Sequence, residues 1–399
     1  MQERVFVTGI GAITGIGKNT VEIFNSLLSE QSGIRSISFL DTIHKDEIPI
    51  CEVKAMNDEL HELAKTSLKS SFTRTALLGM IAAKEALTNS CIQNLSEKRT
   101  GLISATTVGG MDKTEQHFKD YINGNKYNDF VCSHDSGDST EKIADYLGIK
   151  DYVSTLSTAC SASANAIIFG TQLIKHGILD RAIVGGTDAL TKFTLNGFNT
   201  LLILTKEKCR PFDQNRSGLA LGEGAGYLVL ESKKSIEDDN KNIICEITGY
   251  GNACDAFHQT ATSPNGYGPY LAMQKAIEMS GLNSNQIQYI NAHGTGTPNN
   301  DLTEGKAIER IFSRNIPYIS STKGYTGHLL GAAGSVEAII SCLTIKKNII
   351  FPNLNFKEPM KDLSFSPTNR IINNVEVENI MSNSIGFGGN NSSLIFSRC

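Results

Sequence analysis

The chain is organised around one uncharged stretch, Leu156-Ser-Thr-Ala-Cys160-Ser-Ala-Ser-Ala-Asn165-Ala-Ile-Ile-Phe-Gly170. It follows a short β-like run that ends at Leu156, and its small and apolar residues predict a buried helix over residues 160–169. Cys160 is then expected in the first turn, beside unpaired backbone N–H groups and the positive end of the helix dipole. That environment favours a thiolate, the form of cysteine that attacks carbon. The alternative, and the commoner case for a cysteine, is a small buried side chain without chemistry.

The bulk composition predicts a globular α/β protein. The 399 residues are 40% hydrophobic, include 36 glycines and carry a net charge of −4, which gives no electrostatic footprint for nucleic acid. Nine cysteines without regular spacing argue against a disulfide framework, and neither they nor the scattered histidines form a metal-binding pattern. Met1 leads almost directly into the strand-like Val5-Phe6-Val7, and no apolar run reaches bilayer length. We therefore expect a cytoplasmic protein without a membrane or nucleic-acid partner.

Strand-like and helix-like segments alternate through the first half of the chain. This order predicts parallel strand pairing and a sheet covered on both faces. The expected strands are residues 4–13, 101–106, 152–156 and 181–186. The expected helices are one capped by Asn19 or Thr20 that ends toward Gly33, one over 72–87 and one over 160–169. Gly9 and Gly11 resemble part of a dinucleotide-binding fingerprint, but Thr14 occupies the place of the third glycine, which disfavours a nucleotide site.

The second half begins and ends as the first does. Residues 246–253 (EITGYGNA) echo residues 6–13 (FVTGIGAI), and each half closes with glycines followed by a strand, in 222–230 and in 386–396. The charged run 231–242 (ESKKSIEDDNKN) lies between them. We therefore expect a duplicated unit with halves 1–240 and 241–399. Coincidence among Gly-rich strand–turn junctions is the alternative explanation.

Two histidines follow predicted strands of the second half. His293 lies in Ala292-His-Gly-Thr-Gly-Thr297 and His328 ends Lys323-Gly-Tyr-Thr-Gly-His328, both in Gly-rich turns. Open α/β sheets place their sites at the carboxyl ends of strands, where Cys160 also lies. One such histidine is more often structural than catalytic, but a cysteine with two histidines at strand exits indicates a nucleophilic site.

The motifs of this chain, taken in order, resemble those of the elongating β-ketoacyl-acyl-carrier-protein synthases (the type I and II condensing enzymes of the thiolase superfamily). The matching segments run nearly the full length: Val7-Thr-Gly-Ile-Gly11, Ser157-Thr-Ala-Cys160-Ser161, Arg210-Pro-Phe-Asp213, Leu221-Gly-Glu-Gly-Ala-Gly226, Ala292-His-Gly-Thr-Gly-Thr297, Lys323-Gly-Tyr-Thr-Gly-His328, Gly331-Ala-Ala-Gly334 and Gly386-Phe-Gly-Gly389. The resemblance implies a thiolase-like α/β fold, with two duplicated βαβαβ-type halves in a five-layer αβαβα sandwich.

The same resemblance implies an acyltransferase that extends fatty acids. Cys160 would carry the acyl chain, and His293 and His328 would stabilise the enolate formed when malonyl-carrier protein loses CO₂. The backbone N–H groups of Cys160 and Phe387 would form the oxyanion hole, with Phe387 acting as a gate between glycines. Lys323 and Glu337 match a pair expected to orient His328.

Other positions take lesser roles by the same resemblance. Thr295 and Thr297 would contact the phosphopantetheine arm or the malonyl carboxylate. Phe198 and Val108 would line the acyl tunnel. Glu304 and Asp255 would be polar groups that support the site from behind. A small basic cluster could meet an acidic carrier protein, and its members are Lys65, Lys69 and Arg74. No cofactor or metal is expected, since the phosphopantetheine arm arrives on the carrier protein, and the enzyme is expected to be a homodimer.

The chain also departs from the usual pattern. The segments before Cys160 and before Arg210 are shortened, and Asn390 stands where a threonine is common. These departures leave open a ketosynthase of a type II polyketide or aryl-polyene-like pathway, paired with a ketosynthase-like subunit. A non-catalytic partner subunit is disfavoured because the nucleophile is present. A Cys–His hydrolase would leave one histidine without a role.

Overall fold

The protein is described by a computed structural model that covers residues 3–68, 71–124, 128–239, 241–313 and 315–399. Its main sheet has ten strands in the order β3-β2-β4-β5-β1-β6-β12-β11-β7-β8. These strands are β1 (Val5–Thr14), β2 (Thr100–Ala105), β3 (Tyr152–Leu156), β4 (Arg181–Asp188), β5 (Gly224–Ser232), β6 (Cys245–Cys254), β7 (Tyr289–Asn291), β8 (Tyr318–Ser320), β11 (Asn379–Ile385) and β12 (Asn390–Ser397). A separate ribbon pairs β9 (Ile349–Ile350) with β10 (Ile372–Asn373).

Thirteen α-helices surround and separate the strands within these described ranges. They are α1 (Thr20–Leu28), α2 (Asn57–Ala64), α3 (Arg74–Asn89), α4 (Met111–Gly124), α5 (Asn128–Cys132), α6 (Ser136–Leu147), α7 (Ala162–Lys175), α8 (Lys192–Thr200), α9 (Lys233–Asp239), α10 (Tyr267–Ser280), α11 (Pro298–Phe312), α12 (Lys323–Thr326) and α13 (Ala333–Lys347). In this set, none combines the length and the apolar character needed to cross a bilayer.

The strand order confirms the predicted duplication. When the main-sheet strands of each half are numbered in the order in which they occur along that half, both halves have the strand order 3-2-4-5-1 from the outer edge of the sheet to its centre. The two halves meet where β1 pairs with β6. The predicted parallel pairing is right for β2 with β3 and with β4. It is wrong for β1, because β5 enters the sheet between β4 and β1 and runs antiparallel to both. The boundary between residues 240 and 241 stays a prediction, since residue 240 lies outside the described residues.

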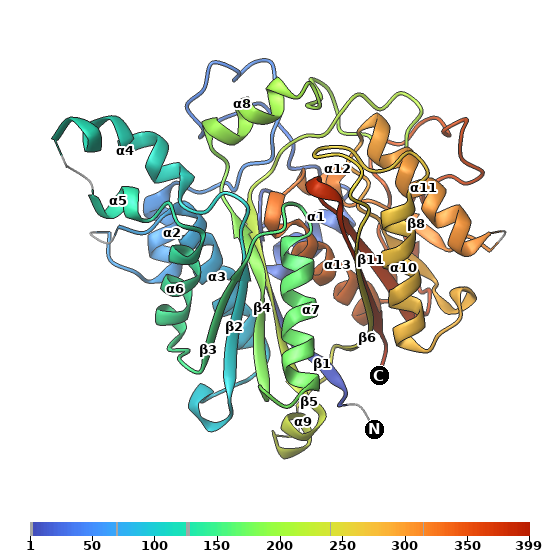
Figure 1. Cartoon of the computed structure of the whole chain (residues 1–399), viewed down its shortest axis with the longest axis horizontal. Helices are drawn as coiled ribbons and strands as arrows, with labels where there is room; N and C mark the ends of the chain where they lie inside the picture. Colours follow the sequence, from blue (N-terminus) through green and yellow to red (C-terminus); the bar gives the residue numbers. More distant parts are fainter. Residues whose placement is uncertain (1–2, 69–70, 125–127, 240, 314) are drawn as a thin grey trace.

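The helices and strands stack in five layers, as predicted (Figure 1). Helix α3 covers β1 and β5 on one outer face, and α10 covers β6 and β12 on the other. Between the two halves of the sheet, α7 and α13 pack against each other. Residues 333–345 of α13 are all buried, as expected for a helix that is surrounded by protein on every side.

The repeated Thr-Gly-x-Gly motif is explained by helix packing. A Cβ atom on Gly9 or Gly11 of β1 would lie 2.2 Å from a carbonyl oxygen of α3. On β6, a Cβ atom on Gly249 would lie 2.2 Å, and one on Gly251 2.1 Å, from a carbonyl oxygen of α10. Only glycine allows helix and strand to approach so closely. The partial dinucleotide fingerprint is therefore a packing device that occurs once in each half.

This packing predicts that Gly251→Ala destabilises the protein. The added methyl group would overlap the carbonyl of Ala272, and overpacking of this kind costs about 1–3 kcal/mol or more. Chemical denaturation should show the loss as a lower midpoint. Gly197→Ala in α8 is the matched control, because its Cβ would meet no atom within 4 Å. An unchanged midpoint for Gly251→Ala would contradict the close approach.

Candidate active site

Cys160 lies on a sharp turn between β3 and α7. The helix begins at Ala162, so the predicted helical start at residue 160 is two residues early. Ala159 has φ 53°, a left-handed conformation that no α-helix interior accepts, and this reverses the chain immediately before the cysteine. The side chain of Cys160 is therefore presented from the tip of a turn into a cavity, although only 6% of the residue is exposed.

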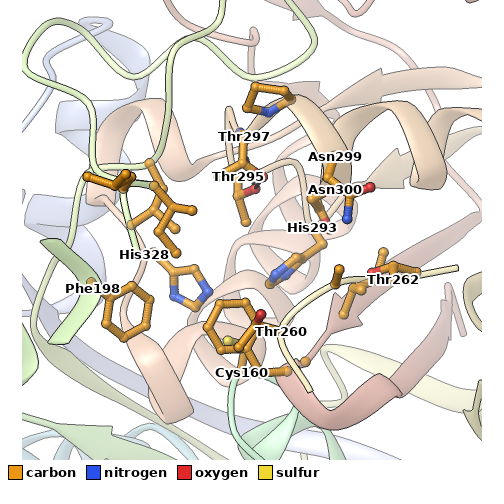
Figure 2. A pocket seen from close by; sticks show the side chains of 18 residues that line it. Cys160, Phe198, Thr260, Thr262, His293, Thr295, Thr297, Asn299, Asn300 and His328 are labelled. Atoms are coloured by element: carbon orange, nitrogen blue, oxygen red, sulfur yellow. Dashed lines mark hydrogen bonds between the residues drawn. The ribbon is translucent and has the colours of Figure 1, made fainter. Parts of the chain in front are cut away.

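The structure brings Cys160 together with both predicted histidines. The cysteine Sγ and the nearest ring nitrogens of His293 and His328 lie within 4.8 Å of one another. The two rings are 5.3 Å apart, centre to centre, and nearly perpendicular at 86°. His293 follows β7 and His328 follows α12, so the second half supplies the imidazoles and the first half the thiol (Figure 2). All three groups line one cavity of about 310 Å³.

The hydrogen bonds at Nδ1 determine which ring nitrogen of each histidine carries the proton. Nδ1 of His293 lies 3.2 Å from Nζ of Lys323, and Nδ1 of His328 accepts a bond of 3.0 Å from the N–H of Leu330. Ammonium and amide groups only donate, so each Nδ1 is an acceptor and each Nε2 carries the hydrogen. Burial first, and then the charge of Lys323, lower the pKa of both rings well below the usual value. Both are therefore neutral donors through Nε2–H.

The Lys323–Glu337 pair is present, but it holds the other histidine. Nζ of Lys323 bonds to Oε1 of Glu337 and donates to the carbonyl oxygen of His293 at 2.7 Å, besides its contact with that ring. The prediction that the pair orients His328 is wrong, because the Leu330 amide already occupies Nδ1 of that ring. Burial raises the pKa of Glu337 to about 7 despite the opposing effect of Lys323.

The cysteine is a thiol in the resting protein. Burial raises the pKa of Cys160 to about 11. The backbone N–H groups of Phe387 and of Cys160 itself point at the sulfur and, with Lys323, lower the pKa only in part. The thiolate expected from the helix terminus is therefore wrong: the cost of desolvating a negative sulfur exceeds the stabilisation by two amides and a distant cation. The two amides are nevertheless placed as the predicted oxyanion hole requires.

Phe387 closes one side of the cavity. Its ring stacks on that of Phe198 with centres 5.9 Å apart, and both rings line the cavity. Gly388 and Gly389 follow in left-handed conformations, with φ 78° and 77°, so the turn depends on glycine. Asp255 lies behind this turn, since its N–H donates to the carbonyl of Gly389.

The unusual Asn390 connects this turn to the nucleophile. Its side-chain oxygen accepts bonds of 2.9 Å from the hydroxyl of Ser161 and from the amide of Asn165. Because Ser161 follows Cys160 directly, Asn390 ties the start of α7 to the strand that follows Phe387. The departure from threonine therefore supplies a hydrogen-bonded link between the halves.

Three other predicted site residues lie where they were expected. Thr295 and Thr297 line the cavity and are hydrogen-bonded to each other at 2.8 Å. Glu304 is buried behind them, where it accepts from the N–H groups of His293 and Gly294 at 2.9 and 2.8 Å. Burial raises the pKa of Glu304 to about 7, although these hydrogen bonds oppose the shift.

Other predicted residues lie elsewhere. Val108 is not among the residues that line the cavity, and its N–H points to Asp188 at 3.3 Å. Thr260 and Thr262 line the cavity without having been predicted. Their position in the sequence could have indicated them, because they follow the carboxyl end of β6 and open sheets place their sites at such ends.

The predicted carrier-protein patch does not form as expected. Arg74 turns inward and bonds to the carboxylate of Glu223 at 2.7 and 3.0 Å, with only 12% of its side chain exposed. It is therefore not available to a partner, because the first turn of α3 packs over a buried acid. Lys65 is exposed at the end of α2. Lys69 lies outside the described residues.

The three converging groups also form a set that could hold a metal ion. Two imidazole nitrogens and one sulfur are ligands that Zn²⁺ accepts. Among the residues that the structure describes, it is the one group of histidine, cysteine and acidic side chains with such convergence. The absence of a resident metal stays a prediction.

The fold and site define a condensing enzyme of the acyltransferase type, and comparison with known proteins defines its family. The family model for the N-terminal domain of β-ketoacyl synthases matches residues 2–235 of the sequence, and the family model for the C-terminal domain matches residues 244–357. The chain belongs to the β-ketoacyl synthase family.

Its relatives include a 3-oxoacyl-[acyl-carrier-protein] synthase and ketosynthases whose names also include a chain length factor. It is 34% identical to 3-oxoacyl-[acyl-carrier-protein] synthase 2 of Staphylococcus aureus (strain N315), over 99% of this chain and 98% of that protein. Among solved structures it is similar to the ishigamide ketosynthase/chain length factor, with a TM-score of 0.92 at 31% identity and full coverage of both chains. The ketosynthase ApeO in complex with its chain length factor ApeC from Xenorhabdus doucetiae gives a TM-score of 0.81 at 31% identity, over 100% of this chain and 98% of that chain.

The raised pKa of Cys160 predicts slow alkylation at neutral pH. Because only the thiolate reacts, the rate with iodoacetamide should rise about tenfold per pH unit from pH 6.5 to 9.5 without a plateau. Intact-mass spectrometry with peptide mapping would follow Cys160 separately from the exposed Cys91, whose alkylation serves as the internal control for reagent activity. A plateau for Cys160 near pH 7 would show that the thiolate is the resting form.

Proposed function

We propose that the protein is a 3-oxoacyl-[acyl-carrier-protein] synthase that joins a malonyl unit to a cysteine-bound acyl chain in fatty-acid elongation. One observation carries the proposal: a buried thiol faces two neutral imidazoles, each with its Nε2–H turned toward the same cavity. The thiol suits covalent catalysis, and the two donors suit the stabilisation of an oxyanion. Because three groups converge, the arrangement serves two half-reactions in sequence.

In the first half-reaction Cys160 takes the acyl chain. Its sulfur attacks the thioester carbonyl of an acyl-carrier protein, and the oxyanion forms between the N–H groups of Cys160 and Phe387. The new bond joins Sγ to the acyl carbon, and the bond from that carbon to the phosphopantetheine sulfur breaks. The proton of the Cys160 thiol ends on the departing phosphopantetheine thiol. Burial, which holds the proton on sulfur in the resting enzyme, also keeps water away from the acyl-enzyme.

In the second half-reaction malonyl-carrier protein loses CO₂. The carbon–carbon bond to the carboxylate breaks and its electron pair forms a thioester enolate, whose oxygen accepts from Nε2–H of His293 and His328. The enolate carbon then attacks the acyl carbonyl on Cys160. Collapse of the tetrahedral intermediate releases the 3-oxoacyl product and the Cys160 thiolate, which takes a proton from water. Neutral rings are required here, because an imidazolium would protonate the enolate.

The substrates arrive on the phosphopantetheine arm of a carrier protein, and we propose no further cofactor. Thr295 and Thr297 present hydroxyls to the arm or to the malonyl carboxylate on the wall of the cavity. Phe198 and Phe387 present aromatic faces to the acyl chain. A second candidate is a polyketide or aryl-polyene-like ketosynthase with a partner subunit. It is favoured by the likeness to two solved ketosynthase structures, each named together with a chain length factor.

We further propose that two subunits pair through β3. This strand is the outer edge of its half of the sheet, and Val153 in it is 40% exposed. An edge strand with an exposed apolar residue is suited to pairing with another strand. A second copy of this chain is the main candidate, and a ketosynthase-like subunit is the alternative.

The mechanism predicts that variants separate the two half-reactions. Cys160→Ala should give no acyl-enzyme and no 3-oxoacyl product. His293→Ala and His328→Ala should still form the acyl-enzyme but lose product formation by about 10²-fold or more. Intact mass reports the acyl-enzyme, and mass spectrometry of the carrier protein reports the product. Cys91→Ser at an exposed position is the control.

Two outcomes would contradict this assignment. Product formation by Cys160→Ala at the wild-type rate would exclude the covalent mechanism. Release of free acid from acyl-carrier protein without malonyl-carrier protein would instead indicate a Cys–His hydrolase.

The pairing proposal predicts that Val153→Lys gives monomers, since a charge on an edge strand opposes strand pairing. Light scattering after size-exclusion chromatography measures the mass, with Val21→Lys on the exposed face of α1 as the control. A wild-type chain that dimerises only when co-expressed with a ketosynthase-like subunit would favour the heterodimer. A Val153→Lys dimer would place the interface elsewhere.

A further inference from the structure

Asp188 is a buried carboxylate at the end of β4 that contacts both halves of the protein. It is fully buried. Its Oδ1 accepts from the hydroxyl of Thr106 and from the N–H groups of Thr107 and Val108, at 3.0 and 3.3 Å. Its Oδ2 accepts from the N–H of Gly331 at 2.7 Å and from that of Thr107 at 3.0 Å. One side chain therefore joins the turn after β2 to the segment that leads into α13.

This carboxylate is maintained against a large desolvation cost. Burial raises the pKa of Asp188 to about 6, and the bonds from Thr106, Thr107, Gly331 and Val108 oppose that shift. Every hydrogen bond to this carboxylate comes from a donor, and a neutral amide could not accept from all of them. The site is therefore built for two acceptor oxygens.

The segment held by Oδ2 also holds His328. Leu330 has φ 52°, a left-handed conformation that is strained for an L-residue. In this conformation the N–H of Leu330 points at Nδ1 of His328 and the next N–H, of Gly331, points at Asp188. A Cβ atom on Gly331 would lie 2.8 Å from Oδ2 of Asp188, so the contact is close. The strained peptide is thus fixed between the carboxylate on one side and the imidazole on the other.

We infer that Asp188 is a positioning residue for His328. By holding Gly331, it keeps the Leu330 N–H on Nδ1 of the ring and so keeps the hydrogen on Nε2, toward the cavity. Lys323 performs the same task for His293 by direct contact, whereas Asp188 acts through two peptide units. The catalytic consequence rests on the proposed function, but the effect on the tautomer of His328 does not.

The test is Asp188→Asn, which keeps the shape and replaces one oxygen by a donor. The three donors on the Oδ1 side favour oxygen there, so the new NH₂ faces the N–H of Gly331 and repels it. Nitrogen-15 NMR of histidine-labelled protein, assigned with His328→Gln, should show an unprotonated Nδ1 in the wild type. In Asp188→Asn this signal should shift toward the average of exchanging tautomers, while the His293 signals stay unchanged.

The kinetic expectation is specific to the second half-reaction. For Asp188→Asn, kcat for condensation should fall roughly tenfold to hundredfold, since small displacements of catalytic groups have effects of this size. Single-turnover acylation of Cys160 should stay within about threefold of the wild type, because that step does not use the ring. In a His328→Ala background the same change should have little further effect on condensation, as expected for residues that act through one another.

Glu52→Gln is the matched control. Glu52 is also a buried carboxylate that accepts three backbone N–H groups, from Ser38, Phe39 and Leu40 at 2.7–2.9 Å. It should change stability without changing the His328 signals or the ratio of the two half-reactions. Should Asp188→Asn fail to fold, Thr106→Val removes one donor to Oδ1 and should shift the same His328 signals by less, while Thr106→Ser restores them.

The inference is overturned by any of three results. These are an unchanged His328 tautomer in a folded Asp188→Asn protein, equal losses in acylation and condensation, and additive losses with His328→Ala. A wild-type protein that makes no 3-oxoacyl product would refute the proposed function, yet the NMR comparison would still decide the role of Asp188.

Discussion

Desolvation of three side chains is the constraint on which this site depends. Cys160, His293 and His328 lie between the two halves of the fold, where burial disfavours every charged form. It raises the pKa of the thiol and lowers the pKa of both imidazoles, so all three are neutral at rest. A site of neutral groups can stabilise negative charge only as it forms, which is what carbanion chemistry requires.

Each ring is held by a donor on its far side, and the two donors differ. Nδ1 of His293 contacts the buried ammonium of Lys323, which in turn bonds to Glu337. Nδ1 of His328 accepts from the backbone N–H of Leu330 in a strained turn, and Asp188 accepts from the next N–H of that turn, of Gly331. Charge near His293 lowers the pKa of both rings, whereas the amide near His328 adds no net charge. Burial, assisted by this one cation, therefore keeps both rings neutral.

Much of the fold could be predicted from the sequence, because the repeat and the central helix depend on local properties of the chain. The repeated Thr-Gly-x-Gly motif indicated the duplication, and the apolar run after Cys160 indicated the central helix α7, whereas the close packing of these glycines on α3 and α10 is seen only in the structure. Arg74 was assigned wrongly because its environment is set by a residue far away in sequence. Arg74 pairs with Glu223, which is 149 residues distant, and no local pattern near α3 reveals that acid.

By itself, the sequence determined the five-layer duplicated fold and the identity of the three groups that meet. The order of strand-like and helix-like segments indicated an α/β sheet, and the echo of residues 6–13 in residues 246–253 indicated a duplicated unit. The five layers were implied by the resemblance of the ordered motifs to those of the β-ketoacyl synthases. Only the tertiary structure decided the protonation of those groups, the partner of Lys323 and the role of Asp188. Burial and hydrogen bonding act between elements that the chain brings together from opposite halves, so they exist only after folding.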